Sequence, residues 1–465
     1  MSIVPKAFII PLIVACALFM ETVDANVIVT ALPAMARDFG QDPVLMQIAI
    51  TSYVVGLGVF IPICGWVADR FGARTVFRAA IAIFVLGSIC CAASTSLATF
   101  TLARFVQGMG GAMMVPVGRI LIFRSVQRSD FIRAMNYMNI PAVLAPAAAP
   151  LLGGFITTYL HWRFIFLINI PIGVLGVYLV NRHIPDLREP HPGRLDWTGF
   201  MLSAVGLALL LLGLSTVGGE LLPGRAAAAM SLSGVALLVA YWFYAHRVEQ
   251  PLLDLRFFRR PTFHASVVGG SVFRIGLGAL PFLLPLMMQE GLGMNAFMSG
   301  LITCASAVGS MFMKFSASPV LRRFGFRRVL IWNAAFSGLA LAACGIFTPH
   351  TPLWLIWCIV LFGGFFPSLQ FTSLNSLAYA EIDSHDIGRA TSVASIVQQM
   401  SLGLGVTVAS IVLQISHEVQ GHASTVWSDF WPAFVCIGLL SACSIPVTLR
   451  LPRHAGDDIA RGRGR

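Results

Sequence analysis

Apolar residues dominate long stretches of this chain, and each stretch is close to the roughly 20 residues that a helix needs to cross a bilayer. Connections rich in polar residues and arginine separate these stretches. Runs of this length exclude the short alternating strands of a membrane barrel. The pattern predicts fourteen membrane-spanning helices, over residues 7–33, 45–69, 76–96, 98–124, 131–157, 161–182, 195–217, 226–246, 263–288, 295–319, 329–347, 353–379, 389–414 and 429–450.

The composition agrees with an all-α polytopic membrane protein. Of the 465 residues, 57% are hydrophobic and 11% are charged, whereas about a quarter of a soluble domain is charged. The net charge of +11 does not indicate nucleic-acid binding, because the basic residues punctuate the apolar runs instead of clustering on a soluble module. We therefore expect the lipid bilayer, and no nucleic acid, as a partner. Lys6 precedes the first run as in a secretory signal, but the run continues to about Pro33, which favours an uncleaved span.

The distribution of basic residues predicts the orientation. Of the 31 Lys and Arg residues, 24 fall in connections on one side, which includes both termini. By the positive-inside rule this side is cytoplasmic, in the inner membrane of a bacterium. The others are Arg37, Arg163 and Arg225 on the opposite side, and Arg104, Arg119, Arg274 and Lys314 within spans.

A short repeat divides the chain. The segment 70–76 reads RFGARTV and the segment 323–329 reads RFGFRRV, an offset of 253 residues. Both follow a predicted span on the cytoplasmic side, so we expect two six-helix bundles of the same orientation, a known plan of transporters. The predicted domains are a first bundle (1–182), two inserted helices (183–262), a second bundle (263–450) and a basic cytoplasmic tail (451–465).

Several motifs resemble those of one protein family. Gly65–Arg74 (GWVADRFGAR) is similar to the pattern G-x-x-x-D-R-x-G-x-[RK], and Leu102–Ala112 (LARFVQGMGGA) to R-x-x-Q-G-x-G. Val23–Pro33 (VDANVIVTALP) is similar to a first-helix signature, and Trp162–Pro171 (WRFIFLINIP) to an entry into helix 6. On these residues the chain resembles the major facilitator superfamily, specifically its fourteen-helix drug:proton antiporter branch. The resemblance implies the major facilitator fold and proton-coupled export.

The resemblance is weaker at the fifth helix and in the second half. Ala149 replaces the first glycine of the antiporter motif G-P-x-x-G-G, whereas Pro150, Gly153 and Gly154 match it. In the second half the likeness rests on hydropathy and the RFG turn, and Arg322 stands where the first repeat has Asp69. The expectation of antiport therefore rests on a motif that this chain matches at all but one of its defined positions.

Two acids, Glu21 and Asp24, lie within the first apolar run. An ionised acid at the bilayer centre costs about 2.5–3.5 kcal/mol, so it is expected to work or to be paired. Three residues apart on a helix they share one face. From the span boundaries, Asp24 lies about 13 Å below the outer surface and Arg104 about 9 Å, which allows the two to pair. We predict that Asp24 exchanges a proton and that Arg104 modulates its proton affinity; the alternative is a static ion pair. For Glu21 three roles are open: a second proton site, a substrate contact or a structural hydrogen bond.

The remaining candidate residues are assigned to gating and to a cavity. The resemblance implies that Gly65, Asp69, Arg70, Gly72 and Arg74 control the conformational cycle. Gly65, Gly153 and Gly154 permit close helix approach, and Pro150 frees a carbonyl group in the fifth span. Polar side chains that can bind substrate, or can hydrogen-bond between helices, are Asn26, Gln107, Arg274, Asn375 and Gln398.

Other function classes find little support in the sequence. There is no G-x-x-x-x-G-K-[ST] loop for ATP, and His417 and His422 are five apart instead of the four that a zinc-protease helix requires. We expect no cofactor, no metal site and no catalytic residues. The predicted function is a monomeric, proton-coupled exporter of lipophilic drugs or other toxic small molecules. The alternatives are a transporter of a specific metabolite or siderophore-like anion, a non-transporting receptor and a polytopic membrane enzyme.

Overall fold

Every regular element that the structure describes is a helix. The structure is a computed structural model, and it describes residues 9–125, 131–185, 195–216, 222–248, 251–378, 381–382, 387–421 and 426–452. Within these residues the predicted all-α architecture is confirmed. Most of the predicted basic tail lies outside the described residues, as does His422.

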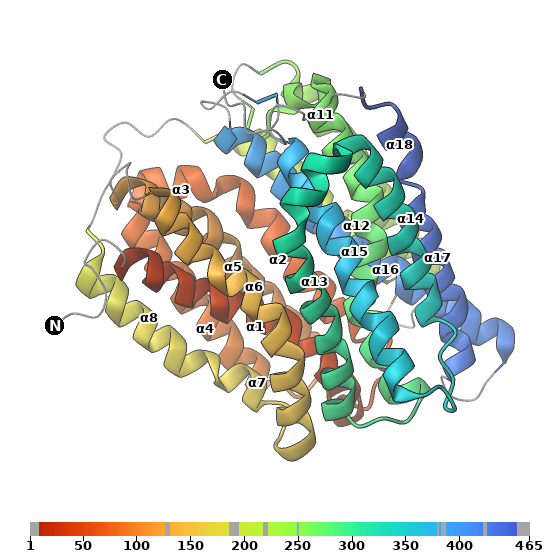
Figure 1. Ribbon diagram of the computed structural model, residues 1–465. Coiled ribbons are helices and arrows are strands. Elements are labelled where there is room, and N and C mark those ends of the chain that lie inside the picture. Colours follow the sequence, from red (N-terminus) through yellow and green to blue (C-terminus); the bar gives the residue numbers. More distant parts are fainter. Residues whose placement is uncertain are drawn as a thin grey trace. The chain divides into compact units, whose positions relative to one another are not determined.

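Each predicted span coincides with one helix or with a run of consecutive helices (Figure 1). Those of the first half and the inserted pair are α1 (Ile9–Phe39), α2 (Gln47–Phe60) continued by α3 (Cys64–Phe71), α4 (Ala73–Ala93), α5 (Leu97–Ser125), α6 (Phe131–Tyr159), α7 (Phe164–Leu167) with α8 (Asn169–His183), α9 (Trp197–Ser215) and α10 (Gly224–Ala245). Helix α1 continues beyond the predicted end at Pro33, because Met35 and Ala36 are still buried.

The second half begins after a short 3₁₀ turn. Its helices are α11 (Pro261–His264), α12 (Gly270–Leu286), α13 (Ala296–Phe324), α14 (Phe326–Cys344), α15 (Leu353–Ala378), α16 (Ile387–Gln420), α17 (Phe430–Ala442) and α18 (Ile445–Leu449). In the described residues, twelve helical segments are long and apolar enough to cross a membrane. The two predicted spans that are not among the twelve are α6 and α14, which are helical all the same.

The helices pack into two units. Unit 1 comprises residues 1–213, 226–244 and 250–252, and unit 2 comprises residues 214–225, 245–249 and 253–465. The inserted helices α9 and α10 therefore fall mainly in unit 1.

The two units repeat one pattern of helix packing. In unit 1, α1 packs against α6 and α8, and both α2 and α4 pack against α5. In unit 2, α12 packs against α16 and α17, and both α13 and α14 pack against α15. Since α4 with α8 and α14 with α17 also correspond, the internal repeat predicted from the RFG segments is confirmed.

The repeated turn has the same geometry in both units. Gly72 joins α3 to α4 with φ 87°, and Gly325 joins α13 to α14 with φ 75°. This part of φ/ψ space is open to glycine and costly for residues with a Cβ. Two residues later, Arg74 Nη2 donates to the carbonyl oxygen of Asn181 at 2.5 Å and Arg327 Nη2 to that of Leu449 at 2.8 Å. These arginines tie the first turn to the end of α8 and the second turn to the end of α18.

Close packing of α1 against α6 depends on a glycine. A Cβ atom added to Gly153 would lie 2.5 Å from the carbonyl oxygen of Val27, so the predicted close approach is confirmed there. Within unit 1, a Cβ atom at Gly65 would meet no described atom within 4 Å, so Gly65 serves no close helix approach inside its own unit. Helix α3 exposes Gly65, and a glycine in a motif does not by itself indicate a contact. Helix α6 continues through Pro150 without a break.

Candidate functional site

Asp24 lies in the middle of α1 and is buried in unit 1. Arg104 Nη1, from α5, donates to Asp24 Oδ2 at 2.6 Å, and the two side chains are 1% and 0% exposed. The predicted pairing of these two residues is therefore confirmed, while their part in proton coupling stays a prediction. A charge-assisted bond of this kind stabilises the charged form of both groups in an environment from which water is excluded.

Two amide side chains complete the donors around Asp24. Gln107 Nε2 donates to Asp24 Oδ1 at 2.8 Å, and Asn169 Nδ2 donates to the same oxygen at 2.7 Å. Both amides also donate to Ser88 Oγ, at 2.8 and 3.1 Å respectively. Gln107 lies three residues after Arg104 on the same face of α5, Ser88 comes from α4, and Asn169 is the first residue of α8. Residues of α5 and α8 therefore donate to a carboxylate of α1, and Ser88 of α4 accepts from both amides.

Glu21 is connected to this network through Tyr53 on α2. The Tyr53 hydroxyl donates to Glu21 Oε1 at 3.2 Å, and the Arg104 guanidinium lies over the Tyr53 ring at 4.3 Å from its centroid. Gly111 on α5 leaves room for this contact, since a Cβ atom there would lie 3.0 Å from the Tyr53 hydroxyl. Arg104 therefore contacts Asp24 directly, and it contacts Glu21 only indirectly, through the ring of Tyr53.

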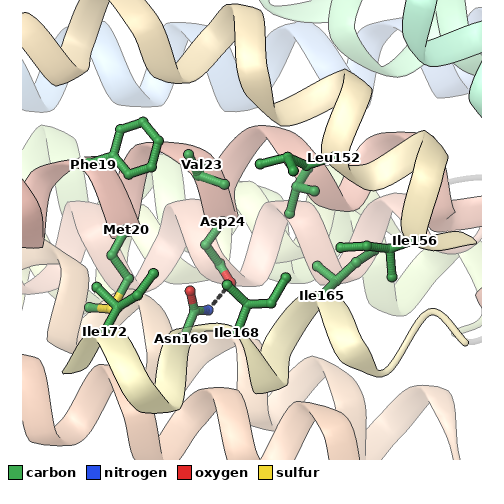
Figure 2. Close-up of a pocket in the computed structure, with 11 residues that line it drawn as sticks. Phe19, Met20, Val23, Asp24, Leu152, Ile156, Ile165, Ile168, Asn169 and Ile172 are labelled. Carbon is green, nitrogen blue, oxygen red and sulfur yellow. Dashed lines mark hydrogen bonds between the residues drawn. The ribbon is translucent and has the colours of Figure 1, made fainter. Parts of the chain in front are cut away.

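A small cavity of about 50 Å³ lies beside Asp24. Figure 2 shows Asp24 and Asn169 as its polar residues, with the amide nitrogen of Asn169 pointing to the carboxylate. The other residues of its lining are apolar and come from α1, α6, α7 and α8: Phe19, Met20, Val23, Val27, Leu152, Ile156, Ile165, Ile168 and Ile172. Such a cavity has room for a few water molecules and none for a drug-sized compound.

The five predicted cavity residues lie elsewhere. Asn26 donates to the carbonyl oxygen of Thr22 in its own helix, and Gln107 is part of the buried network. In unit 2, Arg274 Nη2 donates to Asn375 Oδ1 at 3.1 Å. Gln398 is partly buried in α16. None of the five lines the cavity of Figure 2.

The predicted motif residues surround the turn between α3 and α4. Asp69 and Arg70 are in the last turn of α3, Gly72 forms the turn and Arg74 begins α4.

His417 of the rejected zinc motif lies 3.1 Å from Asp429, measured from Nδ1 to Oδ2, at the end of α16. This contact gives His417 a role in joining α16 to the start of α17.

Sequence reasoning missed Asn169 and Ser88. Asn169 falls within the Trp162–Pro171 motif, and both residues are polar positions in otherwise apolar spans. Polarity at membrane depth was a usable signal, because such side chains usually face a bundle interior. Which of the many polar positions meet at Asp24 depends on helix packing, which the sequence does not give.

Comparison of the sequence with known proteins establishes the family. A model described as Major Facilitator Superfamily matches residues 14–406 and 266–463. The chain belongs to the Major Facilitator Superfamily. MdtD of Serratia proteamaculans (strain 568), which is named as a multidrug resistance protein, is 38% identical to this superfamily member over 442 residues, covering 95% of this chain and 92% of that protein.

Further relatives and solved structures agree with this assignment. HsrA of Haemophilus influenzae, which is named as a transport protein, is 34% identical over 449 residues, covering 97% of each chain. A D-xylose–proton symporter has a TM-score of 0.70 at 14% identity, covering 97% of this chain and 99% of that one. A peptide transporter of the POT family has a TM-score of 0.67 at 18% identity, covering 99% of this chain and 97% of that one. The predicted major facilitator fold is confirmed, and this superfamily member is a multi-pass membrane protein.

Proposed function

We propose that this superfamily member exports lipophilic toxic compounds, including drugs, in exchange for inward protons by alternating access. The name of MdtD, a multidrug resistance protein, supports drugs as the class of substrate. The proposed setting is a bacterial inner membrane with both termini in the cytoplasm, which the distribution of basic residues supports. The proposed working form is a monomer.

One observation carries the proposal: Asp24 is fully buried in a membrane-spanning helix, and Arg104 lies 2.6 Å from it. A buried ion pair adds little to stability compared with apolar residues of the same volume, so stability alone does not account for it. A carboxylate whose cationic partner can move away gains affinity for a proton, and it loses that affinity when the partner returns. We therefore assign the coupling proton to Asp24 and control of its affinity to Arg104.

The other candidate residues receive supporting roles. Glu21, which shares Arg104 with Asp24 through the Tyr53 ring, acts as a second acid or as a contact for cationic substrates. The segment Gly65–Arg74 acts in the conformational cycle, and the tie from Arg74 to the end of α8 supports a mechanical part for it. Pro150, Gly153 and Gly154 set the packing of α6, which Gly153 joins closely to α1.

Transport into liposomes tests this function. Purified protein is reconstituted into liposomes with an acidic lumen and a clamped membrane potential. The probes are radiolabelled tetraphenylphosphonium, a lipophilic cation, and radiolabelled deoxycholate, an amphiphilic anion. The test variant is Asp24→Asn. The matched control is Asp38→Asn, since Asp38 lies on the same helix but is 38% exposed and pairs with Arg163 at 3.3 Å.

We expect the native protein and the Asp38→Asn variant to accumulate at least one probe against its gradient. The Asp24→Asn variant is expected to lose uphill accumulation and to retain downhill exchange, because an amide cannot carry the coupling proton. Uphill transport by Asp24→Asn at the native level contradicts the assignment of Asp24. Accumulation of the anion alone favours the alternative of an anion transporter, and accumulation of neither probe contradicts drug export.

A further inference from the structure

Asn169 contacts Asp24 directly, yet the coupling scheme above gives it no part. It is 3% exposed and donates from Nδ2 to Asp24 Oδ1 at 2.7 Å. We propose that Asn169 is a positioning residue that follows the protonation of Asp24: its amide nitrogen holds the carboxylate, and its amide oxygen accepts a hydrogen bond from the acid once the amide has turned. This inference rests on the proposed function, because it assumes that Asp24 takes up a proton.

The groups around Asp24 fit a carboxylate and do not fit the protonated acid. Arg104, Gln107 and Asn169 all donate to its oxygens. A protonated carboxyl group has an O–H donor, which needs an acceptor when it is buried. The acceptor is either water in the cavity that adjoins Asp24 or one of the three neighbours after a change of contact, and only the second fixes the acid through the protein.

Asn169 is the neighbour that can change at the lowest cost. Arg104 has no acceptor atom. Turning Gln107 would remove its Oε1 from Arg104 Nη1, which donates to it at 2.6 Å. In the part of the chain that the structure describes, Asn169 uses only its Nδ2, towards Asp24 and Ser88. A half turn of this amide exchanges two groups of nearly the same size and brings its oxygen to Asp24.

The surroundings can accept the turned amide. Ser88 Oγ now accepts from Asn169 Nδ2 at 3.1 Å, and because a hydroxyl also donates, it can bond the amide oxygen instead. The cavity of Figure 2 adjoins Asn169, and its volume of about 50 Å³ has room for water to accept from the displaced nitrogen. In the complete step, a proton from solvent binds Asp24, its O–H donates to Asn169 Oδ1, and no covalent bond between heavy atoms changes.

Other titratable groups near Asp24 are Glu21 on α1, Tyr53 on α2, Cys91 on α4 and Arg104 on α5. From α6, α7 and α8, the residues that line the cavity beside Asp24 are apolar apart from Asn169. Replacing Asn169 leaves all four titratable groups in place. A change in the titration of Asp24 in that variant therefore reports on the amide.

The test is an infrared pH titration of the purified protein in liposomes, which needs no substrate. The band of protonated Asp24 is identified as the carboxylic C=O band that Asp24→Asn removes. The test variant is Asn169→Leu. The matched control is Asn333→Leu, since Asn333 is also a buried amide, 4% exposed, and donates to the carbonyl oxygen of Phe366 at 2.6 Å in unit 2.

We expect two changes in Asn169→Leu and neither in Asn333→Leu. The midpoint of the Asp24 band moves to higher pH by about one unit, because the bond lost by the charged carboxylate is stronger than the bond lost by the neutral acid. The band of the protonated acid moves to higher frequency, because its O–H has lost the acceptor. A merely structural role for Asn169 would not move this frequency. An unchanged midpoint, an unchanged frequency, or equal changes in the control overturns the proposal.

A second variant protects the test against a misfolded protein. Ser88→Ala removes the oxygen that accepts from the amides of both Asn169 and Gln107, and it is expected to move the midpoint in the same direction by a smaller amount. No shift in a folded Ser88→Ala variant, if Asn169→Leu does not fold, also overturns the proposal. Absence of any band that Asp24→Asn removes overturns it too, whereas the liposome transport assay judges the proposed function separately.

Discussion

Replacing Arg104 by methionine should destabilise the protein strongly, because it leaves a carboxylate buried without its cation. The Asp24 side chain is 0% exposed and would keep only the amide donors of Gln107 and Asn169. Removing one partner of a buried ion pair typically costs about 3–5 kcal/mol. We expect a loss of this size for Arg104→Met, and the loss belongs to the buried charge more than to the missing side chain.

The double variant Arg104→Met with Asp24→Asn separates these two contributions. With both residues neutral, no uncompensated charge is buried, so most of the lost stability should return. The two changes should therefore be non-additive by about 2 kcal/mol or more.

Unfolding in mixed micelles of increasing SDS content, followed by tryptophan emission, measures these differences. Arg163→Met is the control, because Arg163 pairs with Asp38 at 3.3 Å while 34% exposed. An exposed pair of this kind contributes about 1 kcal/mol or less. Additive losses in the double variant, or an equal loss in the control, would refute the reasoning that Asp24 is a buried charge held by Arg104.

Glycine positions give two further predictions. Gly153→Ala should cost about 1–3 kcal/mol of stability in the same unfolding assay, because the new Cβ atom would lie 2.5 Å from the carbonyl oxygen of Val27. The control Gly65→Ala should cost nothing, because its Cβ atom meets no described atom within 4 Å. Equal losses in the two variants would contradict the packing of α6 on α1. Gly72→Ala and Gly325→Ala should each cost about 1–3 kcal/mol, since both positions have positive φ, at 87° and 75°. A loss at one of these two positions alone would contradict the equivalence of the repeated turns.

The two units show why a short repeat in the sequence was informative. The RFG turn needs a glycine because its backbone has positive φ, and the arginine two residues later reaches the end of α8 in the first half and of α18 in the second. These requirements are local, so they leave the same residues in both halves. The rest of the second half is free to vary as long as its helices remain apolar. Outside the RFG turn, the second half therefore resembles the family only in its hydropathy.

Motif matching was less reliable than burial in assigning roles to single residues. Gly65 belongs to a specific motif but touches no described atom at its Cβ position, whereas Gly153 does pack closely. For Gln107 the sequence left open a substrate contact or a hydrogen bond between helices, and its amide donates to Asp24 of another helix. A motif records that a residue type is needed, and only coordinates show what that residue touches.

The sequence by itself determined the membrane-spanning helices and the repeat, and it allowed the pairing of Asp24 with Arg104. Apolar length, the positions of basic residues and the cost of a buried acid act locally along the chain, so they can be read without a structure. Only the tertiary structure decided that Gln107 and Asn169 donate to the same carboxylate, that Ser88 accepts from both amides, and that a cavity adjoins the carboxylate. Many polar side chains in the spans were equally suitable by type, and the packing of α4, α5 and α8 around α1 selects among them, because a hydrogen bond requires contact within about 3 Å.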